Sequence, residues 1–166
     1  MHSAKSVANF FLEKAKADGI ELTQMKLHKL IYFAHGWHLA LVGEPLISEP
    51  VKAWRHGPVI DSVYQEFKHF GSKAITEKAF HIEFSDSGQI EVIEFKENFS
   101  TNTRSILEQV YQIYKNFSAT ELREMTHAVG SPWHQYWKDG NSEFGNVTIP
   151  NDAIKTYFET LKKRGN

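Results

Sequence analysis

The chain has 166 residues, nearly equal numbers of acidic and basic side chains, a net charge of −1 and no cysteine. The lack of cysteine excludes disulfides and thiolate metal sites, and the balanced charge does not fit a strongly basic nucleic-acid-binding protein. This length favours a single domain over residues 1–166, which can bury about 70% of the surface that the unfolded chain exposes. The N-terminal segment lacks the long apolar run of a signal peptide, so we expect a soluble cytoplasmic protein.

The first two predicted elements are helices. Apolar side chains recur every three or four positions over residues 3–17 and again over residues 23–43. Thr23 suits the N-cap of the second helix, and Gly43 suits the left-handed turn that ends it. The second helix is apolar on more than one face, so we expect it in the middle of the domain, although it is too polar to span a bilayer. Its predicted buried residues are Leu27, Leu30, Ile31, Ala34, His38 and Leu41.

A short extended segment is predicted next. Pro45 and Pro50 exclude a helix before Val51–Trp54, where apolar and polar residues alternate. Gly57-Pro58 then predicts the start of a third helix, because proline suits the first helical turn. The inward residues of that helix are predicted to be Ile60, Val63, Tyr64 and Phe67.

Between residues 80 and 95 the apolar period changes from three or four to two. Residues 85–88, Ser-Asp-Ser-Gly, supply turn chemistry between the two apolar runs, which predicts a β-hairpin with one apolar face. A hairpin alone is only marginally stable. We therefore expect it to pack on the helices or to gain a third strand, for which the segment at Val51 is the candidate.

The last third of the chain reads as helical. A helix is predicted over residues 100–116, a second begins at the capping box of Ser118 and Glu121, and a short third begins at Ser131-Pro132. Residues 139–145 are predicted as a loop, and Asn151 as the cap of a final helix. The predicted inward residues of these helices are Ile106, Leu107, Val110, Ile113, Tyr114, Phe117, Leu122, Met125, Val129, Ile154, Tyr157, Phe158 and Leu161. The predicted fold class is mainly α (α+β): a compact multi-helix bundle around the central buried helix, with a small antiparallel β-hairpin or three-stranded sheet.

No catalytic, cofactor or metal site is predicted, although the chain has nine histidines. His35 and His38 are three positions apart on one helix, but His28 is two turns away and no HExxH pair occurs. We interpret these histidines as structural. Asp61 with His56 is the best local acid/base pair, and we interpret Asp61 as favouring a helix N-terminus. No GxSxG, phosphate loop or GxGxxG is present.

The sequence offers candidates for two kinds of binding surface, one for nucleic acid and one for protein. The cationic residues Lys26, Lys29 and Arg55 are scattered, so surface solvation explains them better than nucleic-acid binding. Tryptophans are common in both cores and protein interfaces. The predicted partner-binding residues are Trp54, Arg55, His56, Trp133 and Trp137.

The stretch over residues 26–71 resembles the hallmark segment of the SocA-like antitoxins, the Panacea domain. The matching residues are Lys26-Leu27, Lys29-Leu30-Ile31-Tyr32, Gly36-Trp37-His38, Gly43-Glu44-Pro45-Leu46, Ala53-Trp54, Gly57-Pro58-Val59 and Tyr64, and later Ser131-Pro132-Trp133. His28 stands where glutamine is common. Within this segment, Gly36 would allow a neighbouring helix to approach closely.

The resemblance implies an antitoxin that binds and neutralises a cognate protein toxin by direct complex formation, with no catalytic residues to carry over. Alternatives are an adaptor that delivers the toxin to an AAA+ protease, a small hydrolase or metalloenzyme that uses His35, His38, His56 or Asp61, and a phage–host interaction protein, since some members are linked to prophages. The resemblance places toxin contacts on the hairpin, in residues 131–145 or at the helix ends. No nucleic acid, membrane or cofactor partner is expected.

Overall fold

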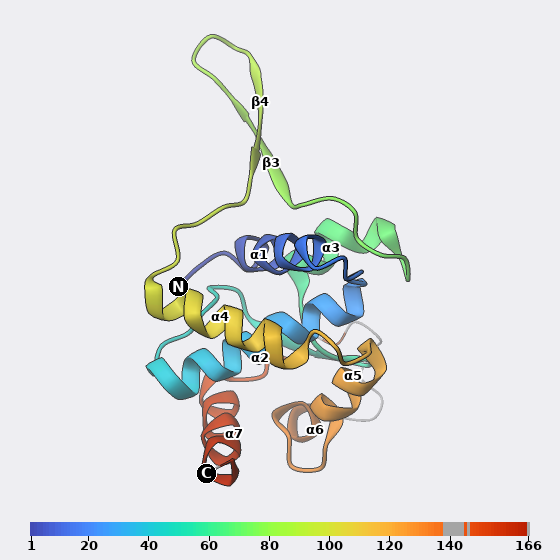
Figure 1. The fold of residues 1–166 in the computed structure, drawn as a ribbon, viewed down its shortest axis with the longest axis vertical. Helices are drawn as coiled ribbons and strands as arrows, with labels where there is room; N and C mark the ends of the chain where they lie inside the picture. The colour runs from blue at the N-terminus through green and yellow to red at the C-terminus, as the bar shows by residue number, and fades with distance from the viewer. Residues whose placement is uncertain (138–144, 146, 166) are drawn as a thin grey trace.

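The computed structural model describes residues 1–137, 145 and 147–165, and within them it is mainly α-helical (Figure 1). The helices are α1 (Ala4–Ala17), α2 (Gln24–Val42), α3 (Asp61–Phe67), α4 (Thr101–Tyr114), α5 (Ala119–His127), α6 (Pro132–Tyr136) and α7 (Asn151–Arg164), with a 3₁₀ turn η1 (Lys68–Phe70) after α3. The strands are β1 (Val51–Trp54), β2 (Gly57–Ile60), β3 (Phe80–Phe84) and β4 (Ile90–Glu94), paired as two separate antiparallel hairpins. The predicted fold class is confirmed. None of the described helices combines the length and apolar character needed to cross a bilayer.

Helix α2 is the centre of the core, as predicted. The Thr23 hydroxyl accepts a hydrogen bond from the backbone N–H of Lys26, and Gly43 ends the helix at φ 88°. Helices α1, α3, α4, α5 and α7 and strand β2 all contact α2. Gly36 has the predicted role, since a Cβ there would overlap the ring of Phe158 on α7. The predicted burial of Leu41 is wrong. Its side chain is 49% exposed, because it lies in the last turn of α2, which extends beyond the helices packed against it.

The predicted helix start at Gly57-Pro58 is wrong. These residues open β2, which pairs with β1 in the register Val51↔Ile60 to Trp54↔Gly57, and α3 begins only at Asp61. The tight turn between the strands needs a residue at φ 112°, and Gly57 supplies it without a Cβ penalty. On its other edge β1 accepts the segment 147–149, through hydrogen bonds Ala53 N–H to Val147 O and Ile149 N–H to Val51 O of 2.9 and 2.8 Å.

The third strand predicted for the second hairpin is therefore also wrong. Both edges of β1 are occupied, so the segment at Val51 is not available to β3 and β4. The β3–β4 hairpin pairs with no other strand in the described residues and projects away from the helices (Figure 1). The prediction that its apolar face packs on the helices is also wrong, because the hairpin projects from the helices and most of that face is exposed.

The C-terminal helices follow their predicted caps with small differences. The capping box of Ser118 and Glu121 is present at the start of α5. Ile113 and Val129 were predicted inward but are 57% and 89% exposed, because Ile113 lies on the outer face of α4 and Val129 lies beyond the end of α5. Asn151 is the first residue of α7, not its cap, which is Pro150. Residues 139–144 of the predicted loop lie outside the described residues.

Candidate interaction surfaces

The β3–β4 hairpin carries an exposed apolar face. Cross-strand partners Ile82 and Val92 are 56% and 66% exposed, and Phe84 and Ile90 are 74% and 66% exposed. Phe80, at the base of the same face, is 42% exposed. We call these five side chains the hairpin face. Alternation along each strand places them on one side, because successive strand residues point to opposite sides of the pleat.

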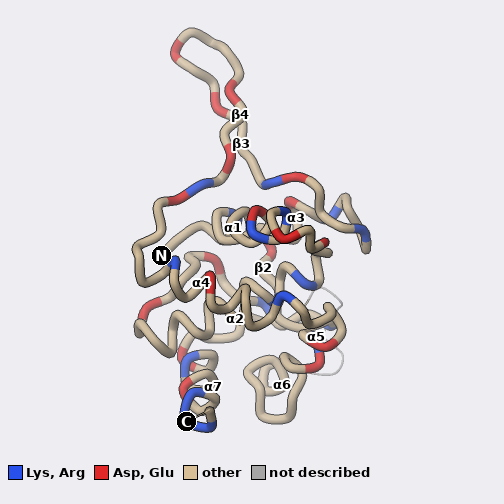
Figure 2. The backbone as a smooth tube through the Cα atoms, viewed as in Figure 1, with Lys and Arg blue, Asp and Glu red and all other residues tan. Residues whose placement is uncertain are grey.

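The rest of the hairpin is acidic. Glu83, Asp86, Glu91 and Glu94 lie along it, whereas Lys and Arg are found only at its base (Figure 2). There Lys78 forms ion pairs of 3.1 Å with both Glu13 of α1 and Glu94. The opposite end of the molecule, at the C-terminus of α7, is rich in cations (Figure 2). The hairpin that carries the exposed apolar face therefore has a negative charge.

One buried asparagine of α1 holds the base of the hairpin. The side-chain amide of Asn9 donates to the carbonyls of Ala79 and Phe95 at 2.8 and 2.9 Å, and its oxygen accepts from the Ala79 N–H at 2.7 Å. Asn9 is 5% exposed. These bonds join the residues before β3 and after β4 to a helix of the core, so the hairpin is anchored at both of its ends.

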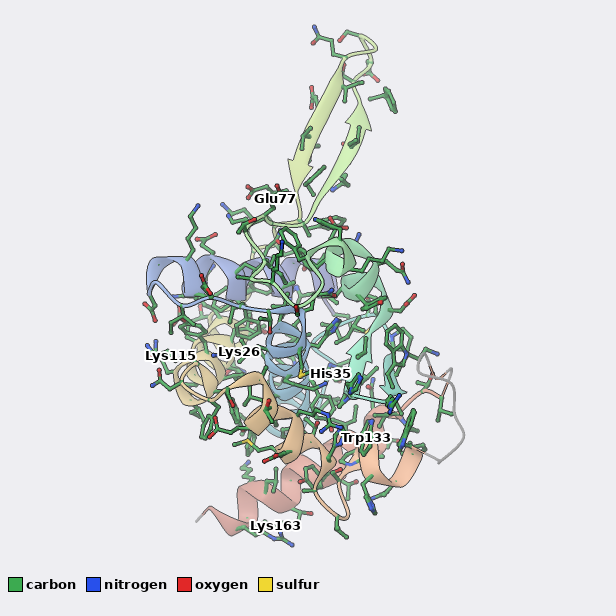
Figure 3. All side chains as sticks on the ribbon, turned by 90° about the vertical axis from the view of Figure 1, so that its right-hand side faces the viewer. Lys26, His35, Glu77, Lys115, Trp133 and Lys163 are labelled. Atoms are coloured by element: carbon green, nitrogen blue, oxygen red, sulfur yellow. The ribbon has the colours of Figure 1, made fainter. Side chains whose placement is uncertain are left out.

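A second group of aromatic side chains lies beside the turn between β1 and β2. The Trp133 indole N–H donates to the Trp54 carbonyl at 2.7 Å, and the Trp133 ring stacks between His127 and Trp137, with centroids at 3.5 and 5.7 Å. Figure 3 shows Trp133 on the face turned toward the viewer. Trp54 packs edge-to-face on Tyr64. Burial, and then the charges of Arg123 and Lys29, lower the pKa of His127 to about 4.

The structure places the predicted partner-binding residues around this one turn. Trp54 and Trp133 are buried and belong to the core, whereas Trp137 is half-buried. Arg55 and His56 are the exposed turn residues between β1 and β2. We call Arg55, His56 and Trp137 the turn surface, since they are its accessible part.

The histidines of α2 are held by hydrogen bonds inside the protein. The His38 ring lies 2.7 Å from the Glu44 carbonyl and 3.2 Å from the Thr103 hydroxyl. His35, which Figure 3 labels, lies 2.9 Å from the Asn151 side-chain oxygen. Burial lowers the pKa of both rings. No group of three or more His, Asp or Glu side chains in the described part of the chain is placed to hold a metal ion. Asp61 lies in the first turn of α3 and accepts from Gln65 at 3.2 Å.

Lys29 does not lie at the surface, where solvation was predicted for it. Its side chain is 1% exposed, and its ammonium group donates to the Pro58 carbonyl at 3.1 Å. A Cβ on Gly57 would come within 2.5 Å of the Lys29 Nζ, so only glycine leaves room for this lysine. Burial, and then the charge of Arg123, lower the pKa of Lys29 to about 7. One contact thus joins three residues of the segment on which the family resemblance rests.

Sequence reasoning missed the exposure of the hairpin face. The alternation of apolar residues indicated an apolar side correctly, but period alone does not say whether that side meets the core or solvent. The acidic residues of the hairpin were the available signal, since no lysine or arginine occurs within residues 80–95.

Comparisons with known proteins give matches to SocA-like antitoxins. The family model described as antitoxin SocA-like, Panacea domain, matches residues 27–134. Antitoxin SocA of Caulobacter vibrioides is 35% identical over 160 residues, which cover 96% of this chain and 84% of that protein. No solved structure shows a significant match.

Proposed function

The chain belongs to the SocA-like Panacea-domain antitoxin family, and from this premise we propose that it binds a cognate protein toxin and neutralises it by forming a complex. The antitoxin role rests on the family and on the similarity to Antitoxin SocA. The family also supports a non-enzymatic role. We infer the direct complex and its contact surface from the hairpin face and the turn surface.

The exposed hairpin face is the observation that carries the proposal. Soluble proteins rarely leave contiguous large apolar side chains in water, and exposed strand edges attract other chains. Burying Ile82, Phe84 and Val92 against another protein would contribute roughly 1.5–3 kcal/mol for each side chain that becomes fully buried. A hairpin anchored by Asn9 presents this face with little ordering cost.

The charge around the hairpin face indicates the chemistry of the toxin. Glu83 and Glu91 lie on the other side of the hairpin, Asp86 lies in its turn and Glu94 lies at its base, and residues 80–95 contain no lysine or arginine. A complementary partner would carry an apolar patch edged by Lys and Arg, because opposite charges at the rim speed and orient association. We therefore expect the toxin to contact the hairpin with a basic surface.

The turn surface is a second proposed contact. Arg55 and Trp137 are residue types that recur in the strongest contacts of protein interfaces, and the buried pair Trp54 and Trp133 holds the turn in place. Its predicted role is smaller than that of the hairpin, because the accessible apolar area there is one half-buried ring.

Co-expression with the toxin gene tests the proposal. We expect wild type to restore growth, and the double variant Ile82→Ser/Val92→Ser to fail and to bind the purified toxin at least about tenfold more weakly. The matched control is Ile113→Ser/Val129→Ser, which removes exposed apolar side chains elsewhere and should rescue growth. Both doubles should unfold at the wild-type temperature.

Three results would contradict the proposal. Rescue and binding by the hairpin variant equal to those of wild type would remove the hairpin face as the contact. The absence of any complex between the purified wild-type pair would remove direct neutralisation. A fall in toxin concentration that depends on a protease would replace complex formation by delivery for degradation.

A further inference from the structure

A cleft of about 710 Å³ lies between the start of α2, the start of α5, the β1–β2 hairpin and η1. Its volume is in the range typical of small-molecule sites. Its lining includes Gln24, His28, Lys29, Tyr64 and Lys68, and no Asp or Glu is among the described residues that line it. The hairpin face is not part of this cleft.

Two side chains of α2 that line this cleft each have one buried polar atom without a hydrogen-bond partner in the described residues. His28 is 3% exposed, and its Nδ1 accepts from the Ile60 N–H at 3.4 Å. Because burial, and then Lys29, lower the pKa of His28 to about 3, the ring is neutral and carries its proton on Nε2. That buried Nε2 has no hydrogen-bond partner in the described residues, and neither has the Oε1 of Gln24, which is 9% exposed. Buried polar atoms without partners are rare, so each one calls for a ligand group or an ordered water.

The cleft also holds a buried lysine that forms no ion pair with a described residue. The Lys29 ammonium donates to the neutral carbonyl of Pro58, and burial together with repulsion from Arg123 lowers its pKa to about 7. An anionic ligand beside it would favour its charged form. Lys68 adds a second, exposed cation at the cleft, where it donates to Gln65 at 2.8 Å. Cations gathered without carboxylates favour an anionic ligand.

Two helices begin at this cleft. Thr23 and Gln24 at the start of α2 line it, and so do Ala119 and Thr120 at the start of α5. The first turn of a helix leaves backbone N–H groups without partners inside the helix and carries positive charge, which favours phosphate. Thr23 and Ser118 each cap one of these N–H groups, and Glu121 places a carboxylate in the first turn of α5, so the start of α2 is the more favourable of the two. Both starts lie on the same side of the molecule (Figure 1).

One wall of the cleft is aromatic. Trp54 and Tyr64 both line the cleft and contact each other edge-to-face, with centroids 4.9 Å apart. Aromatic walls of this kind bind flat rings, including nucleic-acid bases. A ligand that fits all these features has a phosphate group, a flat ring, and donors and acceptors between them.

We propose that this cleft binds a phosphorylated nucleoside, with its phosphates near Lys29, Lys68 and the helix starts and its base against Tyr64 and Trp54. The unpartnered Nε2–H of His28 donates to a phosphate oxygen, and Oε1 of Gln24 accepts from a base amine or a sugar hydroxyl. This site does not include the hairpin face, although His56 of the turn surface lines it, and its test uses no toxin.

Isothermal titration calorimetry of the full chain tests this site, with ADP, GDP, CDP and UDP as probes and with adenosine and pyrophosphate as the two halves of ADP. We expect at least one nucleoside diphosphate to bind more tightly than either half. Lys68→Ala should weaken that binding by about fivefold or more, and Lys29→Met should remove it. The matched control is Lys73→Ala, an exposed lysine outside the lining, which should bind as wild type.

The Lys68→Ala variant keeps the test decisive if Lys29→Met fails to fold. No heat with any of the four diphosphates at ~1 mM would overturn the proposal. So would diphosphates that bind no tighter than pyrophosphate, or an affinity that Lys68→Ala leaves unchanged.

Discussion

At the scale of single residues, the contact of Lys29 with Gly57 and Pro58 ties the central helix to the β1–β2 hairpin. The Lys29 side chain is buried, and its ammonium group donates to the carbonyl of Pro58 in β2. In a helix starting at Gly57, that carbonyl would instead accept a backbone hydrogen bond within the helix. A buried lysine without a carboxylate is costly in its charged form. Three of the residues on which the family resemblance rests, Lys29, Gly57 and Pro58, are therefore explained by packing and by one hydrogen bond.

Replacing Gly57 should be far more costly than replacing another glycine with positive φ. Gly57→Ala adds a methyl group beside Lys29 and strains a φ of 112°, so we expect a loss of about 3 kcal/mol of unfolding free energy. Gly88→Ala, at φ 78° with open space around it, should lose about 1 kcal/mol. Urea denaturation measures both, and equal losses would contradict the close contact.

The pH dependence of stability should depend on Lys29. Its pKa is about 7 in the folded chain and near 10.5 when unfolded, so between these pH values the unfolded state binds a proton that the folded state lacks. The unfolding free energy of wild type should then rise with pH from about 7 to about 10, relative to Lys29→Met, by at most about 1.4 kcal/mol per pH unit. Urea denaturation of both proteins at several pH values measures the difference. Parallel pH curves would show that Lys29 titrates normally.

At the scale of elements, the two hairpins differ in how their apolar residues are used. The β1–β2 hairpin lies in the core and has a further segment, 147–149, on its outer edge. The β3–β4 hairpin pairs with no other strand in the described residues, and its position depends on bonds at its base. Of its apolar face, Phe80 and Val92 line a groove with residues of α1, whereas Phe84 and Ile90 are largely exposed. The independence of this hairpin makes it suited to contact another protein.

Loss of the Asn9 side chain should loosen the β3–β4 hairpin selectively. Asn9→Ala leaves the Phe95 carbonyl and the Ala79 N–H without their Asn9 partner, which costs about 1–3 kcal/mol, whereas the Ala79 carbonyl still accepts from the Phe95 N–H. We expect faster amide hydrogen exchange in residues 80–95 with α2 unchanged, measured by mass spectrometry. Asn9→Asp places a buried carboxylate oxygen against the Ala79 and Phe95 carbonyls, so it should increase exchange at least as much. Unchanged exchange in Asn9→Ala would mean that other contacts hold the hairpin.

At the scale of the whole molecule, α2 is shared by almost every other element. Phe158 of α7 packs on α2 beside Gly36. The centroid of its ring lies 5.8, 6.2 and 5.2 Å from those of Tyr32, Phe33 and Trp37. A core shared in this way favours unfolding in one step, as expected for the predicted single domain over residues 1–166.

A cavity at Phe158 should therefore destabilise the whole chain at once. Phe158→Ala should cost about 3–5 kcal/mol, a large share of an ordinary domain's stability. Far-UV circular dichroism and tryptophan fluorescence should still report one coincident transition, because Trp37 packs on the same ring. Ile113→Ala, at an exposed position, should change little. Two separate transitions would contradict a single domain.

The sequence by itself determined the elements whose signals are local. The cap at Thr23, the left-handed turn at Gly43 and the capping box at Ser118 were all found where predicted, because each depends on bonds within a few residues. The close approach at Gly36 was also predicted. Its partner Phe158 was not, since more than a hundred residues separate them.

Only the tertiary structure decided where the apolar and charged residues of those elements lie. Pro58 entered a strand because β1 was there to pair with it, Lys29 became buried because Gly57 left room, and the hairpin face stayed exposed because β1 was already paired on both edges. Each outcome depends on which distant segment packs against these residues in the folded chain. The hydrophobic period does not say which segment that is. The proposed contact surface and the cleft arise from these long-range choices.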